Sequence, residues 1–68
     1  MSLVSHLGRH RKVAGLTQAQ LAEAVGVSRK TINTVENQVF IPSTLLALKL
    51  AKALDKNVED LFALKDDL

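Results

Sequence analysis

The chain has 68 residues, of which 47% are hydrophobic but only 3% aromatic, and its net charge is +2. This length corresponds to one domain, residues 1–68, close to the lower limit at which a single hydrophobic core is stable, so we expect the chain to oligomerise. Cysteine is absent, no apolar run approaches the roughly 18 residues of a membrane span, and the N-terminus lacks the order of a signal peptide. These features exclude a disulfide framework and a thiolate metal site, and they predict a cytoplasmic protein without a membrane partner.

Two helices are predicted in the first third of the chain. Apolar residues recur at helical spacing before Gly15, at Leu3, Leu7 and Ala14. This pattern indicates a first helix of about three turns that ends at the glycine. Thr17 can then cap a second helix, because Gln20, three residues later, completes a capping-box pattern. Gly26 ends this short second helix.

A third helix, residues 28–37, is predicted after a turn of about three residues, because Ser28 provides a new N-cap soon after the glycine. Its only apolar residues are Ile32 and Val35, which mark the buried side. The opposite face is polar and rich in hydrogen-bonding groups: Arg29, Lys30, Asn33, Thr34 and Asn37.

The last part of the sequence predicts a loop and two more helices. Residues 38–42 form the loop, because Pro42 and the β-branched residues before it cannot continue a helix. Ser43 begins a fourth helix whose leucines and alanines cover more than one stripe, which indicates two buried faces. Asn57 caps a fifth helix, which contains the apolar residues Leu61, Phe62 and Leu64. The expected fold is therefore all-α, a bundle of five helices.

The most informative segment is LTQAQLAEAVGVSRKTINTVE, residues 16–36, which places two capped helices around a glycine turn. Ala22 is small where the two helix backbones approach closely, and Gly26 supplies the backbone freedom of the bend. With the later segments LALKLAKAL and VEDLF, this pattern resembles the phage Cro and repressor type of helix-turn-helix protein, the XRE family. The resemblance covers nearly the whole chain and is strongest to compact, stand-alone, lambda-repressor-like members, with the helix-turn-helix at residues 17–37.

The resemblance implies that helix 28–37 enters the major groove of double-stranded DNA, that Gln18 contacts a phosphate, and that Arg11 and Glu36 form a structural ion pair. The chemistry of the residues agrees with these roles, because arginine bonds bidentately to guanine, asparagine pairs with adenine, and threonine contacts the thymine methyl. Base contacts are expected from Arg29, Lys30, Asn33 and Thr34. Phosphate contacts are expected from Gln18, Ser28, Thr17 and Asn37, the first of them at a helix start that favours anions.

Two departures from the family pattern follow the third helix. Gln38 stands where the family usually has glycine, which ends the helix in a left-handed conformation. Val39, Phe40 and Ile41 replace the basic residues that often grip phosphate, so a basic clamp is not expected from this loop. The apolar loop is expected to pack on the core or on a second subunit.

The sequence gives little support for catalysis or metal binding. His6 and His10 have a spacing that could share a metal ion, but no third ligand stands nearby, so we interpret them as a solvated pair. A Gly-rich phosphate loop, a nucleophile elbow and paired catalytic carboxylates are all lacking. We therefore expect no metal, no cofactor and no enzymatic activity.

Together these features predict a sequence-specific transcriptional regulator, with repression as the expected effect, that binds an inverted-repeat operator as a homodimer. The dimer is expected to use apolar residues of the fourth helix, the fifth helix and the tail that exceed the needs of the core: Leu45, Leu48, Phe62, Leu64 and Phe40. The alternative is an antitoxin-like module that uses the same scaffold to cover a partner protein. Salt-dependent binding to a palindromic duplex favours the first interpretation, and binding to a neighbouring gene's product without DNA favours the second.

Overall fold

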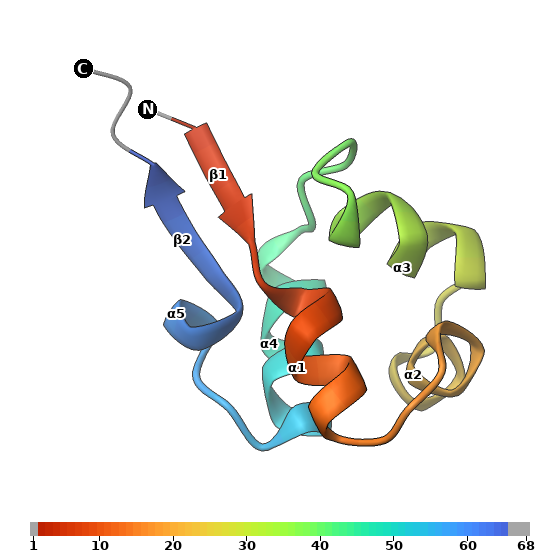
Figure 1. Cartoon of the computed structure of the whole chain (residues 1–68). Coiled ribbons are helices and arrows are strands. Elements are labelled where there is room, and N and C mark those ends of the chain that lie inside the picture. Colours follow the sequence, from red (N-terminus) through yellow and green to blue (C-terminus); the bar gives the residue numbers. More distant parts are fainter. Residues whose placement is uncertain (1, 66–68) are drawn as a thin grey trace.

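The computed structural model describes residues 2–65 and contains the five expected helices with a short strand at each end (Figure 1). In chain order the elements are β1 (Ser2–Ser5), α1 (Leu7–Val13), α2 (Gln18–Val25), α3 (Arg29–Glu36), α4 (Thr44–Leu54), α5 (Val58–Leu61) and β2 (Phe62–Lys65). The five predicted helices are therefore confirmed. The prediction that the whole chain is α-helical is wrong, because both ends of the described chain form strands.

Three helices begin at the side-chain caps that the sequence indicates. Thr17 Oγ1 accepts the backbone N–H of Gln20 at 3.0 Å, and Gln20 Oε1 accepts the N–H of Thr17 at 2.9 Å, which completes the capping box of α2. The hydroxyls of Ser28 and Ser43 cap α3 and α4 by accepting a backbone N–H, each at 3.1 Å. Local sequence alone therefore sets the starts of these three helices.

The four longer helices end in one common hydrogen-bonded turn. After each helix a residue has a positive φ, and the residue after it donates its N–H to the carbonyl five positions back, which is the Schellman pattern. The residues with positive φ are Gly15 (76°), Gly26 (76°), Gln38 (61°) and Asp55 (54°). Glycine adopts this conformation without steric cost, whereas a residue with a Cβ does not. The ends of α3 and α4 are therefore strained.

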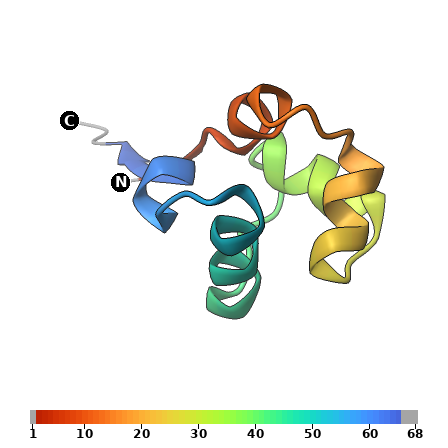
Figure 2. The ribbon, with the colours of Figure 1, turned by 90° about the horizontal axis from the view of Figure 1, so that it is seen from below.

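The core lies between the helix pair α2–α3 on one side and α5 with the two strands on the other. In both views of the ribbon, α1 and α4 occupy the space between these groups (Figures 1 and 2). The buried apolar side chains come from all five helices and β2: Leu7, Leu21, Ala22, Val25, Ile32, Val35, Leu46, Leu50, Ala51, Leu54, Leu61 and Phe62. The α2–α3 pair is thus fixed to the rest of the domain by a shared core.

Residues 2–5 form a strand instead of the first turn of a helix. β1 pairs antiparallel with β2, with Leu3 opposite Leu64 and Ser5 opposite Phe62. The expectation was wrong because Leu3 lies four residues before Leu7, and one residue at that spacing fits a helix and a strand equally well. The partner strand, which lies at the far end of the chain, decides between them.

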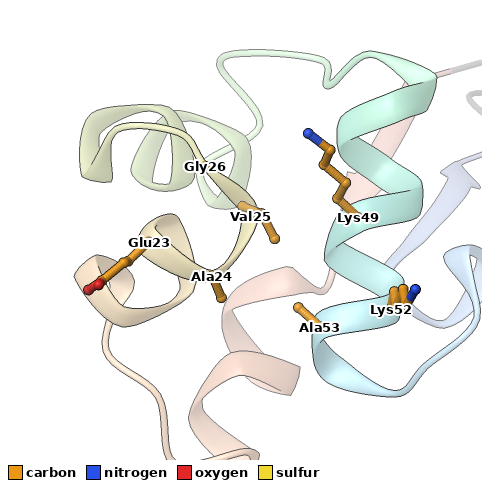
Figure 3. Close-up of a pocket in the computed structure, with 7 residues that line it drawn as sticks. All are labelled: Glu23, Ala24, Val25, Gly26, Lys49, Lys52 and Ala53. Carbon is orange, nitrogen blue, oxygen red and sulfur yellow. The ribbon is translucent and has the colours of Figure 1, made fainter.

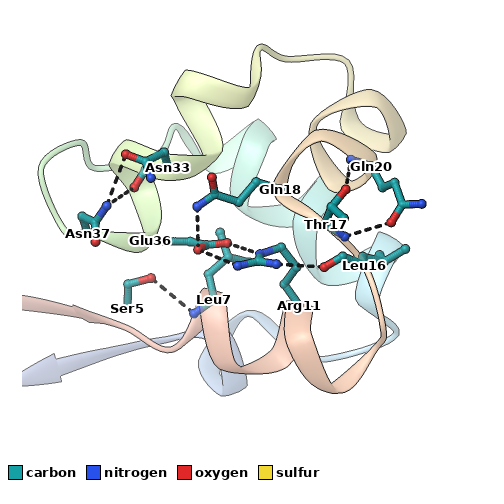
Figure 4. A network of polar contacts seen from close by, with 10 residues as sticks. All are labelled: Ser5, Leu7, Arg11, Leu16, Thr17, Gln18, Gln20, Asn33, Glu36 and Asn37. Carbon is teal, nitrogen blue, oxygen red and sulfur yellow. Dashed lines mark hydrogen bonds and ion pairs between the residues drawn. The ribbon is translucent and has the colours of Figure 1, made fainter.

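Two hydrogen bonds set the start of α1 at Leu7. Ser5 Oγ accepts the backbone N–H of Leu7 at 3.3 Å, and the N–H of His6 donates to Leu61 O at 2.7 Å (Figure 4 draws the first). The second bond ties the entry of α1 to the end of α5. The chain therefore leaves the strand and enters the helix within a single residue.

The fifth helix is shorter than the sequence predicted, and this changes the role of Phe62. Phe62 has extended backbone angles, φ −134° and ψ 140°, so α5 ends at Leu61. Side chains alternate along β2, and Phe62, which is 7% exposed, faces the core. Phe62 is therefore part of the core and not surplus to it, although it also lines a hollow that contains Leu48, and its place in a dimer interface stays a prediction. The tail after Lys65, which was also expected to contribute, lies outside the described residues.

Within residues 2–65, no helix has the length and apolar character needed to span a bilayer.

Candidate nucleic-acid interface

The outward face of α3 gathers the side chains expected to contact bases. Ile32 and Val35 are fully buried and fix the opposite side of the helix against the core. With about 100° of rotation per residue, the side facing away from them carries three of the expected residues in one row, and Arg29 flanks that row at the start of the helix. The three are Lys30, Asn33 and Thr34. Lys30 and Arg29 are exposed, and Asn33 and Thr34 are half-buried.

Bonds within α3 hold part of this face in place. Asn37 Nδ2 donates to the backbone oxygen of Asn33 at 3.0 Å and to its Oδ1 at 3.3 Å (Figure 4). Thr34 Oγ1 donates to Thr31 O at 2.9 Å. These bonds restrict the side-chain rotamers at the surface and leave the amide nitrogen of Asn33 without a partner among residues 2–65. The face is partly preorganised and still offers a free donor.

The residues expected to contact phosphate lie at two helix starts and at the end of α3. Thr17 and Ser28 use their hydroxyl oxygens as caps, yet a hydroxyl that accepts a bond can still donate one. Gln18 is half-buried in the first turn of α2, where unpaired N–H groups and the positive end of the helix favour an anion. Asn37 is exposed directly after α3.

Arg11 and Glu36 form the ion pair that the family resemblance implied, and it joins α1 to the end of α3 (Figure 4). Arg11 Nε lies 2.6 Å from Glu36 Oε2, and Arg11 Nη2 lies 3.2 Å from Glu36 Oε1. Both side chains are about nine-tenths buried. Arg11 Nη1 also donates to Leu16 O at 2.8 Å, which extends the network to the segment before α2. A buried pair of this kind is strongly destabilising to break from one side only.

The surroundings of the pair favour the charged form of both groups. Burial, the strongest influence on Glu36, raises its pKa, but hydrogen bonds from Arg11 and Gln18 and the charges of Arg11 and Lys12 outweigh burial and bring the pKa below its ordinary value. The hydrogen bond to Glu36 raises the pKa of Arg11, and this effect outweighs the opposing effect of burial. Glu36 is therefore a carboxylate that can only accept hydrogen bonds.

Sequence reasoning did not foresee a third member of this network. Gln18 Nε2 donates to Glu36 Oε1 at 3.1 Å, although the two residues belong to α2 and α3. The position of Gln18 at the helix start was recognised, but its partner depends on the angle between two helices, which no local pattern specifies.

An apolar face lies beside the strands and consists of Leu3, Phe40, Ile41, Leu48 and Leu64. It borders two adjoining hollows that share Leu3 and Ile41 in their linings. Ile41 is 70% exposed, Leu64 71% and Leu48 57%. Three residues expected in a dimer interface, Phe40, Leu48 and Leu64, thus lie on one face. Leu45 instead lines a separate hollow with Phe40, and the sequence reasoning missed Leu3 and Ile41.

A further hollow between α2 and α4 does not assemble a reactive site (Figure 3). Its lining consists of Glu23, Ala24, Val25, Gly26, Lys49, Lys52 and Ala53. The charged ends of Glu23, Lys49 and Lys52 diverge in the close-up instead of converging on a common point. Among residues 2–65 no group of three or more potential metal ligands occurs either. This hollow therefore brings no set of charged groups together.

A short capped helix, a tight turn closed by glycine and a second helix with a polar outward face define a helix-turn-helix DNA-binding domain. The chain belongs to the helix-turn-helix family of the Cro and repressor type, and the family model matches residues 7–61. Members of this class are DNA-binding regulators of transcription and not enzymes.

Known proteins of similar sequence carry the same assignment. The chain is 49% identical over 59 residues to an uncharacterized HTH-type transcriptional regulator of Methanothermobacter thermautotrophicus, covering 85% of this chain and 86% of the relative. It is 43% identical over 53 residues to the uncharacterized HTH-type regulator YgzD of Bacillus subtilis, covering 78% and 80% of the two chains.

Two solved structures resemble the fold closely. The restriction-modification controller protein C.AhdI from Aeromonas hydrophila has a TM-score of 0.75 and 35% identity, covering 79% of this chain and 82% of that one. The P22 c2 repressor protein, solved in complex with a synthetic operator, has a TM-score of 0.75 and 32% identity, covering 78% and 80%.

Proposed function

We propose that this chain is a cytoplasmic repressor that binds an inverted-repeat operator as a homodimer, with residues 17–37 as the DNA-binding unit and α3 in the major groove. The observation that carries the proposal is the row of Lys30, Asn33 and Thr34 on the outward face of a helix whose other side is locked into the core. The similarity to a repressor solved with its operator supports the same assignment.

The DNA-contact roles can be tested on a duplex selected by the protein from a random pool. Arg29→Ala and Asn33→Ala should each weaken binding by about 1–3 kcal/mol and relax the preference at one or two base pairs per half-site. Lys30→Ala should also weaken binding, and a fall of about 1 in the slope of log affinity against log salt concentration would show that Lys30 neutralises a phosphate as well. Equal losses on selected and random duplexes for Arg29→Ala and Asn33→Ala would contradict base readout.

Lys56→Ala is the matched control for charge, because Lys56 is exposed in the turn between α4 and α5. That turn lies at the opposite side of the fold from α3 in Figure 1. The control should leave both affinity and salt slope unchanged. Transcription in vitro from a promoter that carries the selected site should fall when the protein is added, and a rise would replace repression with activation.

The apolar face is the surface that we propose joins two copies. Contiguous exposed apolar residues are uncommon on monomers, and a two-fold dimer doubles the DNA contacts of a small domain. The selected operator should then be an inverted repeat with half-sites about one DNA turn apart, roughly 34 Å. Leu48 and Leu64, which are 57% and 71% exposed, are the residues that we propose as the centre of this interface.

Sedimentation equilibrium tests the dimer directly. Leu48→Glu should convert the dimer to a monomer at micromolar concentration and abolish tight operator binding without changing the helical circular dichroism spectrum. Val13→Glu is the matched control, because Val13 is 81% exposed at the end of α1, outside the apolar face. A wild-type protein that stays monomeric both free and on DNA would exclude the dimer.

The same apolar face also fits the second candidate function, an antitoxin-like module that covers a partner protein. The two candidates differ in what the face binds. Stable dimerisation together with salt-dependent operator binding supports the repressor, whereas a monomer that binds a neighbouring gene's product and shows no affinity for duplex DNA supports the module.

A further inference from the structure

We propose that Glu36 is the positioning residue for the phosphate contact: its Oε1 holds the carboxamide of Gln18 so that one N–H remains directed to a DNA phosphate. This inference rests on the proposed function, because it assumes that Gln18 contacts the backbone of DNA. Glu36 carries a negative charge and cannot bind phosphate itself, so it would contribute to phosphate binding through Gln18.

The carboxylate of Glu36 is held firmly enough to position another group. Its Oε2 accepts Arg11 Nε at 2.6 Å, and its Oε1 accepts both Arg11 Nη2 at 3.2 Å and Gln18 Nε2 at 3.1 Å. Arg11 is itself anchored by donating to Leu16 O at 2.8 Å. Because the glutamate side chain is about nine-tenths buried, these bonds have little competition from water.

The chemistry of the contact fixes the orientation of the Gln18 amide. An ionised carboxylate has no proton to donate, so the amide must turn its nitrogen and not its oxygen towards Glu36. The nitrogen carries two hydrogens, and one is donated to Glu36. The second has no partner among residues 2–65, and Gln18 is half-buried in the first turn of α2, where an anion is favoured. Without Glu36 the amide is free to rotate or flip.

Gly8 provides a way to disturb this contact without removing a polar group. A Cβ at Gly8 would lie 3.1 Å from Glu36 Oε1, the oxygen that accepts the Gln18 bond. The carboxylate would have to move by a few tenths of an ångström to admit a methyl group. Alanine also favours a helix more than glycine does, so a thermal melt of Gly8→Ala is needed to show whether this gain offsets the displacement of the carboxylate.

The main experiment measures operator and random-duplex affinity for four proteins: wild type, Gln18→Ala, Arg11→Met with Glu36→Met, and the combination of all three substitutions. The methionine pair removes one charge of each sign and fills the site with apolar groups of similar volume, a replacement that proteins often tolerate. Thermal melts establish that each variant is folded. Lys56→Ala serves again as the control.

Gln18→Ala should weaken binding about tenfold per half-site, the value of one hydrogen bond to a charged group, and equally on both duplexes. The methionine pair should cause a similar loss, and adding Gln18→Ala to it should change affinity less than about twofold. The salt slope should stay constant throughout, because a neutral amide displaces no counterion, whereas a general misplacement of Arg29 and Lys30 would lower it.

Gly8→Ala keeps the inference testable if the methionine pair does not fold. It should weaken binding roughly threefold, because the hydrogen bond weakens without breaking, and this loss should disappear in the Gln18→Ala background. If the methionine pair or Gly8→Ala weakens binding as much in the Gln18→Ala background as in the wild type, the positioning role of Glu36 is excluded. No effect of Gln18→Ala alone would instead remove the phosphate contact, and no DNA binding by the wild type would remove the proposed function.

Discussion

Gln38 combines a strained backbone with a specific side-chain bond, and two substitutions can separate the effects. Its φ of 61° lies in the left-handed region, and its Oε1 accepts the backbone N–H of Ser5 at 3.0 Å, which ties the end of α3 to β1. Gln38→Ala removes the bond but keeps the Cβ in the unfavourable conformation. Gln38→Gly removes the bond and the steric cost together.

The magnitudes follow from these two contributions. A residue with a Cβ in the left-handed conformation costs about 1–2 kcal/mol, and a hydrogen bond of this kind contributes about 0.5–1.5 kcal/mol. Gln38→Ala should therefore lower the free energy of unfolding by about 1 kcal/mol. Gln38→Gly removes the steric cost and so regains part of that loss, although glycine also gains conformational freedom in the unfolded chain. The free energy of unfolding of the glycine variant should therefore be about 1 kcal/mol higher than that of the alanine variant.

Thermal melts followed by circular dichroism provide the measurement. A difference of about 1 kcal/mol corresponds to about 4–8 °C in melting temperature for a domain of this size, which is easily resolved. Urea titration gives the same comparison at constant temperature. If the alanine and glycine variants melt together, the left-handed turn carries no strain, and the reasoning about the end of α3 fails.

Three further expectations concern stability. Asp55→Gly should raise the free energy of unfolding by about 1 kcal/mol, since φ of Asp55 is 54°, and an unchanged melting temperature would argue against strain there. Phe62→Ala should lower it by about 3–5 kcal/mol as a core substitution, and a fully stable variant that merely dissociates would return Phe62 to an interface. Because the native pKa of Glu36 lies below its unfolded value, its ionisation stabilises the fold above about pH 4.3, and this contribution is lost as the pH falls through the native pKa. Glu36→Gln, compared by urea titration at several pH values, should lose less stability than wild type on acidification, and parallel losses would contradict the pKa.

The parts of the fold that the sequence predicted correctly are those coded by neighbouring residues. The caps at Thr17, Ser28 and Ser43 and the glycine turns depend on bonds within a few positions, so their signals are visible in the chain. The two strands were missed because each is four residues long and is stabilised by a partner from the other end of the sequence. The sequence does contain one indication of β2, because the large apolar residues Phe62 and Leu64 are two positions apart, as on one side of a strand.

The same division applies to the candidate site. The outward row of α3 follows from helical periodicity, and the ion pair was implied by family resemblance. The bond between Gln18 and Glu36 and the close approach of Gly8 to that carboxylate depend on helix crossing angles. The left-handed turn at Gln38 was hard to predict for a different reason. The glycine that usually indicates such a turn is absent from the sequence, but the left-handed backbone conformation is still present.

The pairing of β1 with β2 also sets an order of folding events. Ser2 and Lys65 stand opposite each other in the ladder, so their contact closes almost the entire described chain into one loop. The helical contacts of α2 and α3 are local and can form on the fast timescale of helix pairing, whereas the strands must meet after a search over the whole chain. Leu3 and Leu64, which lie opposite each other in this ladder, are therefore expected to come together late in folding. The surface that we propose for self-association would then be completed only once the individual chain has closed.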